Sequence, residues 1–162
     1  MIGGVVTLLL AGHLSLAQQP APTSWCVGAH EFVVERLRMA AVVERDTIDD
    51  WRTGKRLTGC RVTAAGLTTE GVPAAARQFY ERLRAAGWAR TPDPQDAPNE
   101  SSLRFRKTGA DCLFNVYRDG TLLTDAELRV SEARIPKPGE ERYGVFAMCM
   151  PALPSKQRTE GN

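Results

Sequence analysis

Hydrophobic and polar residues repeat along this chain with two different periods, and each period predicts a kind of element. Between Pro73 and Ala86, apolar side chains recur every three or four residues, which predicts an amphipathic helix. Proline suits the first turn of a helix, and Gly87 is placed to end this one. We therefore expect residues 73–86 to form a helix with one buried face.

Other segments alternate apolar and polar residues, which is the pattern of a strand with one buried face. In the first of them, Cys60, Val62 and Ala64 alternate with Gly59, Arg61 and Thr63, and we expect this strand to end at Gly66. Stretches containing proline or glycine separate the segments and predict turns or loops. The expected strands are residues 56–65, 102–107, 112–118, 126–134 and 143–150, with an exposed loop at 91–99.

The segment from His30 to Trp51 supports two predictions. Apolar residues at spacings of three and four predict a helix, whereas the valine pair within residues 39–43 favours a strand. We expect the helix, followed by a polar loop at residues 46–56. The elements together predict an α+β fold, with a mostly antiparallel sheet of four to five strands and one or two helices packed on one face.

The ends of the chain predict export. Residues 2–17 carry no charged side chain, and their apolar stretch of about a dozen residues is shorter than the ~20 of a membrane-spanning helix. Small residues at Ser15 and Ala17 fit a cleavage site. We expect a signal peptide at 1–17, with a retained anchor or a buried strand as alternatives. The expected organisation is then a proline-rich leader at 18–29, a single domain at 30–151 and a disordered tail at 152–162, in the periplasm or secreted.

Four cysteines in an exported chain predict two disulfides. Counting alone leaves three pairings open. Cys112 and Cys149 fall on the apolar faces of two predicted strands, where neighbouring antiparallel strands bring side chains close together. We therefore expect the pairs Cys112–Cys149 and Cys26–Cys60.

The residue types available favour binding over catalysis. No two cysteines have the spacing of a redox or zinc motif, and His30 is the only histidine after the expected cleavage site. Cys26 and His30 lie four residues apart, which suits a metal pair or an activated thiol, but a surface histidine beside a disulfide is the favoured interpretation. No serine-nucleophile or phosphate-loop motif is present, and we expect no cofactor. The net charge of +2 predicts no nucleic-acid partner.

Two groups of polar residues are candidate sites. Asp46, Asp49 and Asp50 beside Trp51 are weak candidates for a calcium site, a sugar site or a carboxylate-based hydrolase, although a solvated turn is favoured. The second group is predicted to share the outer face of the sheet, where it would dock an acidic partner, a polyanionic glycan or lipid headgroups, or form an ordinary wet face. Its members are Arg104, Arg106, Arg129 and Tyr117.

Three stretches carry a resemblance to a family. They read LTGCRVTAAG, FYERLRAAGW and FRKTGADCLFNVYRDG. Across about residues 56–151, the chain resembles small exported bacterial domains of uncharacterised type, with paired cysteines. The resemblance implies an exported α+β fold and no activity.

The function expected from the sequence is therefore binding without catalysis. The chain would be an accessory or assembly subunit that docks onto a larger envelope or membrane complex, and an uncleaved N-terminal segment would add membrane contact. The alternatives are a periplasmic module that binds glycan or peptide through Trp51, Tyr117 and the arginine face, and the aspartate-based hydrolase.

Overall fold

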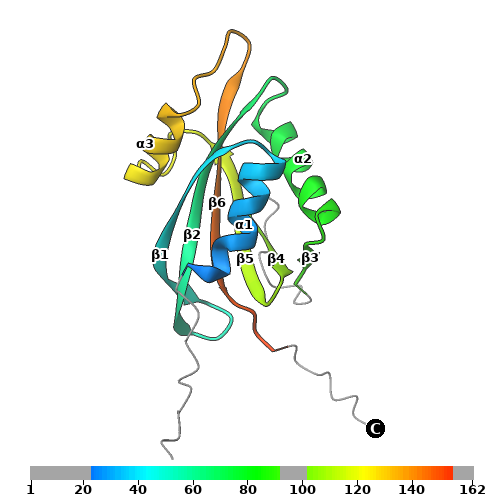
Figure 1. Cartoon of the computed structure of the whole chain (residues 1–162), viewed down its shortest axis with the longest axis vertical. Coiled ribbons are helices and arrows are strands. Elements are labelled where there is room, and N and C mark those ends of the chain that lie inside the picture. Colours follow the sequence, from blue (N-terminus) through cyan, green and yellow to red (C-terminus); the bar gives the residue numbers. More distant parts are fainter. Residues whose placement is uncertain (1–22, 92–101, 155–162) are drawn as a thin grey trace, which may run out of the picture.

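The structure of the chain is a computed structural model, and it describes residues 23–91 and 102–154. The expected signal peptide (1–17), most of the loop at 91–99 and residues 155–162 of the expected tail lie outside the described residues. The folded part begins with a short helical turn within the segment expected to be a leader (Figure 1). The elements are η1 (Ser24–Cys26), α1 (Val27–Glu31), η2 (Phe32–Arg36), β1 (Ala40–Asp50), β2 (Lys55–Thr68), α2 (Val72–Ala85), β3 (Ala89–Arg90), β4 (Ser102–Lys107), β5 (Ala110–Arg118), α3 (Asp125–Glu132) and β6 (Glu141–Pro151).

The fold is α+β, as the hydrophobic pattern predicts, and it is built on one antiparallel sheet. The sheet has six strands in the order β1-β2-β6-β5-β4-β3, not the four to five expected. Every neighbouring pair is antiparallel. The additional strands are β1, which the sequence analysis assigned to a helix and a loop, and the two-residue β3.

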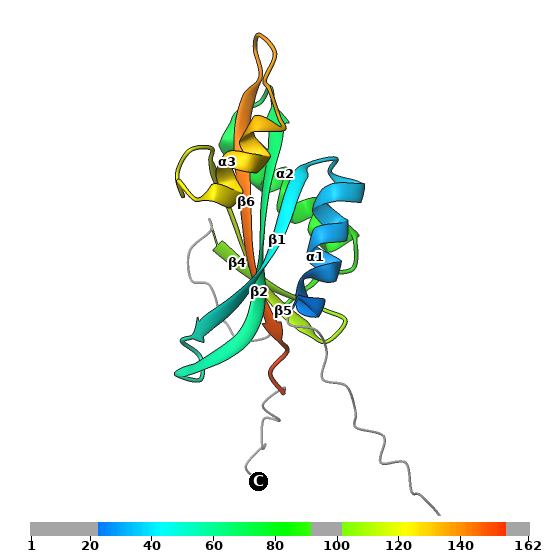
Figure 2. The ribbon, with the colours of Figure 1, turned by 60° about the vertical axis from the view of Figure 1, so that its left-hand side comes forward.

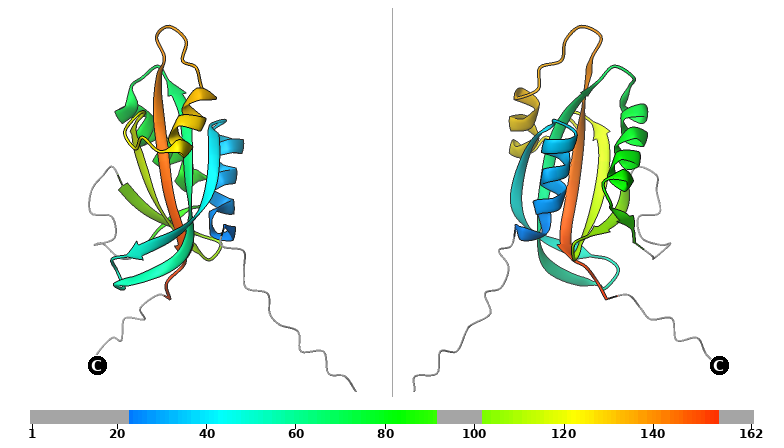
Figure 3. Two further views of the ribbon diagram at one scale, coloured as in Figure 1. Left: turned by 90° about the vertical axis from the view of Figure 1, so that its left-hand side faces the viewer. Right: turned by 45° about the vertical axis from the view of Figure 1, so that its right-hand side comes forward.

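Helices cover both faces of the sheet, not one face as expected. α1 and α2 lie on the first face, and α3 lies on the second, as the two views of Figure 3 show. Figure 2 shows that the β1–β2 hairpin also bends at its tip, toward the side on which α3 lies. The molecule therefore has a thick core under α1 and α2, and a second face that α3 and the hairpin cover only in part.

The main core is aromatic and lies between the first face of the sheet and the two helices. Phe79 on α2 contacts Phe32 and Phe114 at ring distances of 5.5 and 5.7 Å. The hydroxyl of Tyr80 donates a hydrogen bond of 3.0 Å to the Phe114 carbonyl oxygen, so its polar end is satisfied. Helix α2 agrees with the prediction for residues 73–86 to within one residue at each end.

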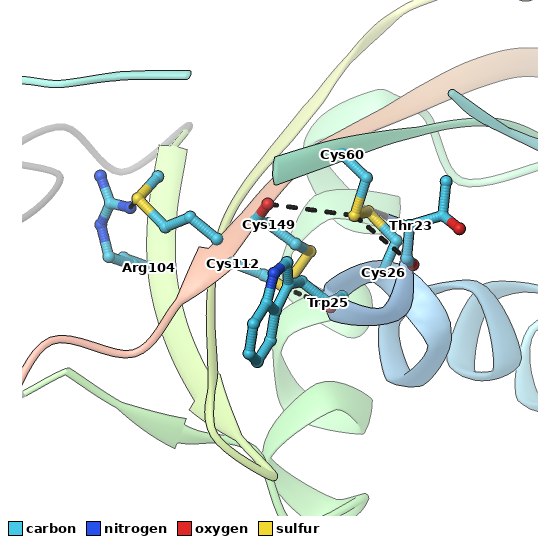
Figure 4. The surroundings of a disulfide bond; sticks show 8 residues. Thr23, Trp25, Cys26, Cys60, Arg104, Cys112 and Cys149 are labelled. Atoms are coloured by element: carbon cyan, nitrogen blue, oxygen red, sulfur yellow. Dashed lines mark hydrogen bonds between the residues drawn. A yellow bond between two sulfur atoms is a disulfide. The ribbon is translucent and has the colours of Figure 1, made fainter. Parts of the chain in front are cut away.

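Both disulfides have the expected pairing. Cys60, Cys149 and Cys112 lie directly opposite one another on the adjacent strands β2, β6 and β5. Cys112 is bonded to Cys149 across the sheet, and Cys60 is bonded to Cys26 above it (Figure 4). The Cys26–Cys60 bond fixes the N-terminal turn against the sheet, because Cys26 lies in η1 and Cys60 lies on β2.

Three predicted elements differ from the structure in their type or in where they end. The helix expected beyond His30 ends at Arg36, and residues 40–50 form β1, so the alternative prediction of a strand at residues 39–43 was better. β2 continues past Gly66 to Thr68, because the ring of Tyr143 on β6 packs over the bare glycine backbone. The strand expected at residues 126–134 is the helix α3.

The change at α3 has a local cause. Thr124 precedes the helix, and its hydroxyl accepts a hydrogen bond from the backbone N–H of Glu127, three residues later. This is half of a capping box, which favours helix initiation. Ala126 and Val130, four residues apart, then face the sheet and are buried, so the helical spacing replaces the alternating pattern.

Candidate functional site

The arginines predicted to form an exposed strip do not form one. Arg104 and Arg106 lie on the same side of β4, opposite Phe105, as expected from alternation. Arg104, however, is buried, and its guanidinium lies 3.9 Å from the sulfur of Met150 (Figure 4). Arg106 makes a two-point ion pair with the buried carboxylate of Asp111, at 2.6 and 2.9 Å. Both arginines are therefore integrated into the fold.

The other predicted binding residues are dispersed. Arg129 lies on α3, where its guanidinium is 3.8 Å from the carboxylate of Glu44. Tyr117 packs its ring over Gly144, and burial, together with the nearby carboxylate of Glu127, raises the pKa of its hydroxyl. Trp51 is exposed in the β1–β2 turn, at the opposite end of the sheet from α3 (Figure 1). The structure does not bring these residues together as one surface.

The three aspartates of the second candidate group are also separated. Asp49 points to the opposite side of β1 from Asp46 and Asp50, and it forms an exposed ion pair with Arg56 at 3.2 Å. Asp50 is buried and accepts hydrogen bonds from Arg52 and Thr53. Within residues 23–91 and 102–154, no group of three or more His, Cys, Asp or Glu side chains could hold a metal ion.

Asp50 belongs to a buried ionic network that the sequence analysis missed. The guanidinium of Arg52 bridges two carboxylates, at 2.8 Å from Asp50 and 3.0 Å from Asp111. Burial by itself raises the pKa of both carboxyls, but the hydrogen bonds from Arg52, Thr53 and Arg106 outweigh it and hold both pKa values below the ordinary value. The network ties the tip of the β1–β2 hairpin to β5, which gives it a structural role.

A third buried carboxylate, that of Glu127, organises the loop in front of α3. Glu127 is almost fully buried, and its two oxygens accept hydrogen bonds from the backbone N–H groups of Leu123, at 2.6 Å, and Thr121, at 3.2 Å. Asp119 accepts hydrogen bonds from Arg142 on β6, at 2.6 Å, and from Ser131. The loop between β5 and α3 is therefore held at both of its ends by charged hydrogen bonds.

The fixed loop presents apolar side chains outward. Leu123 has a φ of 54°, which leucine rarely adopts, and its side chain is 74% exposed. Leu128, one turn into the helix, is 54% exposed. Leu123 and Leu128 occupy the two sequence positions of a hydrophobic staple, but both are exposed. We name as the α3 apolar surface the four exposed large side chains Leu122, Leu123, Leu128 and Ile135.

The charges around this surface are mixed. Exposed cationic and anionic side chains alternate along the helix and the segment after it, with no block of one sign. They are Asp125, Arg129, Glu132 and Lys137. Exposed apolar side chains with charges of both signs near them in the chain are compatible with a protein–protein interface, whereas binding to an anionic membrane needs a basic cluster.

The α3 apolar surface does not follow from the hydrophobic pattern, because that pattern predicts a strand at residues 126–134. In a strand, Leu128 and Val130 share one face and are both buried; in the helix, Val130 is buried and Leu128 is exposed. The signal that could have found it is the Thr124-x-x-Glu127 capping box, with leucine on either side.

No protein family model, curated protein or solved structure matches the chain. The described helices include none that is long and apolar enough to cross a membrane. The two disulfides indicate an oxidising location outside the cytoplasm.

Proposed function

We propose that this chain is an exported, non-enzymatic accessory protein, periplasmic or secreted, that docks onto a larger protein assembly of the cell envelope through the α3 apolar surface. The observation that carries the proposal is Leu123, an exposed leucine held at a positive φ by the carboxylate of Glu127. Exposed apolar groups on a backbone under local strain are found where a protein binds something.

The rigidity of the loop supports docking to a preformed partner surface. Two backbone N–H groups of the loop are bound to one buried carboxylate, and Asp119 anchors its start to β6. A loop that is already ordered loses little conformational entropy when it binds, so a small apolar surface gives more affinity. The mixed rim charges favour a protein as the partner over a lipid headgroup layer.

The buried carboxylates support a binding role over catalysis. Asp50, Asp111 and Glu127 each accept hydrogen bonds from groups that hold a turn or loop in place. The pKa values of Asp50 and Asp111 lie below the ordinary range, so these groups stay ionised and do not suit a general acid at neutral pH.

Photo-crosslinking in the native cells tests the proposal. A photoreactive residue replaces Asp125, which is exposed on the first turn of α3, and in a second strain it replaces Glu81, which is exposed on α2. We expect a discrete adduct with one envelope protein from position 125 and none from position 81, because the two helices cover opposite faces of the sheet.

Substitutions then identify the contact. Leu123→Ser combined with Leu128→Ser should reduce the adduct at least about tenfold, since one buried leucine contributes more than one tenfold step in affinity. Trp51→Ser is the matched control, because Trp51 is exposed to the same 54% as Leu128 but lies at the other end of the sheet. Equal adducts from positions 125 and 81, or an adduct that survives the double substitution, would contradict docking through α3. An adduct with a second copy of this chain would show that α3 forms a homodimer interface and would contradict docking onto another envelope protein.

A further inference from the structure

A cavity on the face opposite α3 has no place in the docking proposal. It has a volume of about 420 Å³, in the range of small-molecule sites, and it lies where three distant segments meet. These are the N-terminal turn with α1, Trp88 between α2 and β3, and the turn between β4 and β5. The lining residues used below are Ser24, Trp25, Glu31, Trp88 and Lys107.

Two polar atoms that belong to the lining residues are buried without a partner. The indole nitrogen of Trp88 and the hydroxyl oxygen of Ser24 make no hydrogen bond within the described part of the chain. Trp88 itself is only 3% exposed, and its ring is fixed edge-on against Phe114 at 5.2 Å. Buried polar groups without partners are rare in folded proteins and each one costs free energy, so two of them at one cavity indicate a site that a ligand completes.

The charges at the cavity balance. Lys107 donates a hydrogen bond of 2.7 Å to the Ala86 carbonyl oxygen, and its ammonium lies 6.0 Å from the centre of the Trp88 ring. Glu31 supplies a carboxylate on the other wall. The lining therefore offers one cation, one anion, two indole rings, a donor-only N–H and a hydroxyl.

We propose that this cavity binds a neutral saccharide ring. An apolar ligand would leave the Trp88 N–H and the Ser24 hydroxyl unpaired, and an ion of either sign would pair with one of Glu31 and Lys107 but face the like charge of the other, so the pair favours a ligand without net charge. A sugar ring has an apolar face for an indole and hydroxyl groups at its edge that both donate and accept. Its hydroxyls can accept from Lys107 and donate to Glu31 and, once a local rearrangement of the wall exposes them, can also bond with the Trp88 N–H and the Ser24 hydroxyl.

A peptide fits this site less well. Extended peptides are held mainly by hydrogen bonds to the backbone of a free strand edge. The walls here are helical and turn segments, and the strands next to them, β4 and β5, are paired with each other along their length. Neither unpaired polar atom is open to solvent, so saccharide binding at these atoms requires a local rearrangement of the cavity wall. We expect the half-buried side chain of Trp25, which is next to Ser24 in the chain, to move in this rearrangement.

The three indole N–H signals of the full-length protein, read by ¹⁵N-correlated NMR, test the proposal. Neutral disaccharides, with cellobiose and chitobiose as the first probes, are added up to tens of millimolar. We expect the signals of Trp88 and Trp25 to shift with saturation, and the signal of Trp51 to stay in place because Trp51 does not line the cavity. A Trp51→Phe variant assigns that signal.

Two variants distinguish specific binding in the cavity from nonspecific binding. Trp88→Phe removes the N–H donor and part of the ring, and it should weaken saccharide binding about tenfold. Ser24 is not part of the core, and Ser24→Ala should weaken saccharide binding about fivefold. Leu123→Ser should leave the titration unchanged. The proposal would be overturned if no neutral saccharide in a panel produced saturable shifts at Trp25 and Trp88, or if only an unstructured peptide did. Neither result would affect the proposal that the protein docks through α3.

Discussion

Leu123 shows at the scale of one residue how the fold maintains an unfavourable arrangement. A leucine at positive φ costs about 1–2 kcal/mol relative to an ordinary backbone conformation, and its exposed side chain recovers little of that by burial. The charged hydrogen bond from the Leu123 N–H to Glu127 offsets the cost, because such bonds contribute about 1.5–3 kcal/mol. The arrangement makes physical sense if the side chain is buried in a complex.

This predicts a separation of stability from docking in the variant Leu123→Gly. Glycine adopts positive φ without strain but loses more entropy on folding, and these effects of about 1 kcal/mol each oppose one another. We expect the free energy of unfolding, measured by urea denaturation, to stay within about 1 kcal/mol of the unsubstituted protein, while crosslinking from position 125 falls about tenfold. Retained crosslinking in a stable Leu123→Gly protein would show that the side chain is not part of the interface.

At the scale of elements, the β1–β2 hairpin depends on a clamp at its tip. Arg52, in the turn, is bound to Asp50 on the same hairpin and to Asp111 on β5, and Arg106 binds Asp111 from β4. The carboxylates are fully buried, so the loss of one charge leaves an arginine without its counter-charge in a poorly solvated place.

Asp111→Asn should therefore destabilise the protein by about 3 kcal/mol, the cost of removing one partner from a buried ion pair. Urea denaturation at neutral pH measures it. Asp49→Asn is the matched control: Asp49 lies on the same hairpin, but its ion pair with Arg56 is exposed, and we expect a change within about 0.5 kcal/mol. Similar losses in the two variants would mean that the buried network contributes no more than a surface pair.

The same elements show what the sequence could predict. Periodicity identified α2, β4, β5 and β6, because each has one buried face and a clear period. It misjudged β1, where the apolar residues Val42 and Val43 are adjacent and fit both periods, and α3, where Leu128 and Val130 imitate a strand. At α3, the local hydrogen bonds of Thr124 and Glu127 determine the conformation. The spacing of hydrophobic residues carries no information about these hydrogen bonds.

Candidate sites were harder to predict than elements for a physical reason. The cysteine pairs could be anticipated because strand register brings Cys112 opposite Cys149. The cavity could not, because Ser24, Trp88 and Lys107 come together only through the packing of three segments. Arg104 and Arg106 were placed on the correct side of their strand, but their burial depends on the chain that folds over that side.

For the whole molecule, the antiparallel sheet acts as a divider between two surfaces. The disulfides, the aromatic core and the proposed saccharide cavity lie on the face that α1 and α2 cover, whereas the ionic clamp and the α3 apolar surface lie on the side of α3. Figure 3 shows the helices on these two faces. Both faces rest on β2, β6 and β5, which carry Cys60, Cys149 and Cys112 directly opposite one another. Ligand binding and docking are therefore expected to be independent, apart from their shared dependence on the stability of the sheet.

That stability should depend on pH on the acid side. The folded-state pKa values of Asp50 and Asp111 lie below the ordinary value, because the hydrogen bonds to their ionised forms outweigh the effect of burial. A carboxyl with a depressed pKa in the folded state stabilises the fold fully above its unfolded pKa of about 4, and the contribution disappears as the pH falls through the folded-state value.

We therefore expect the free energy of unfolding to change little from about pH 7 to about pH 5 and to fall steeply below about pH 4. Urea denaturation across this range measures the profile. Asp111→Asn should start from lower stability at neutral pH and lose less on acidification, because one of the two titrating carboxyls is gone and the other remains. A parallel loss in the variant and the unsubstituted protein would place the acid sensitivity in other groups and show that protonation of Asp111 is not what loosens the hairpin.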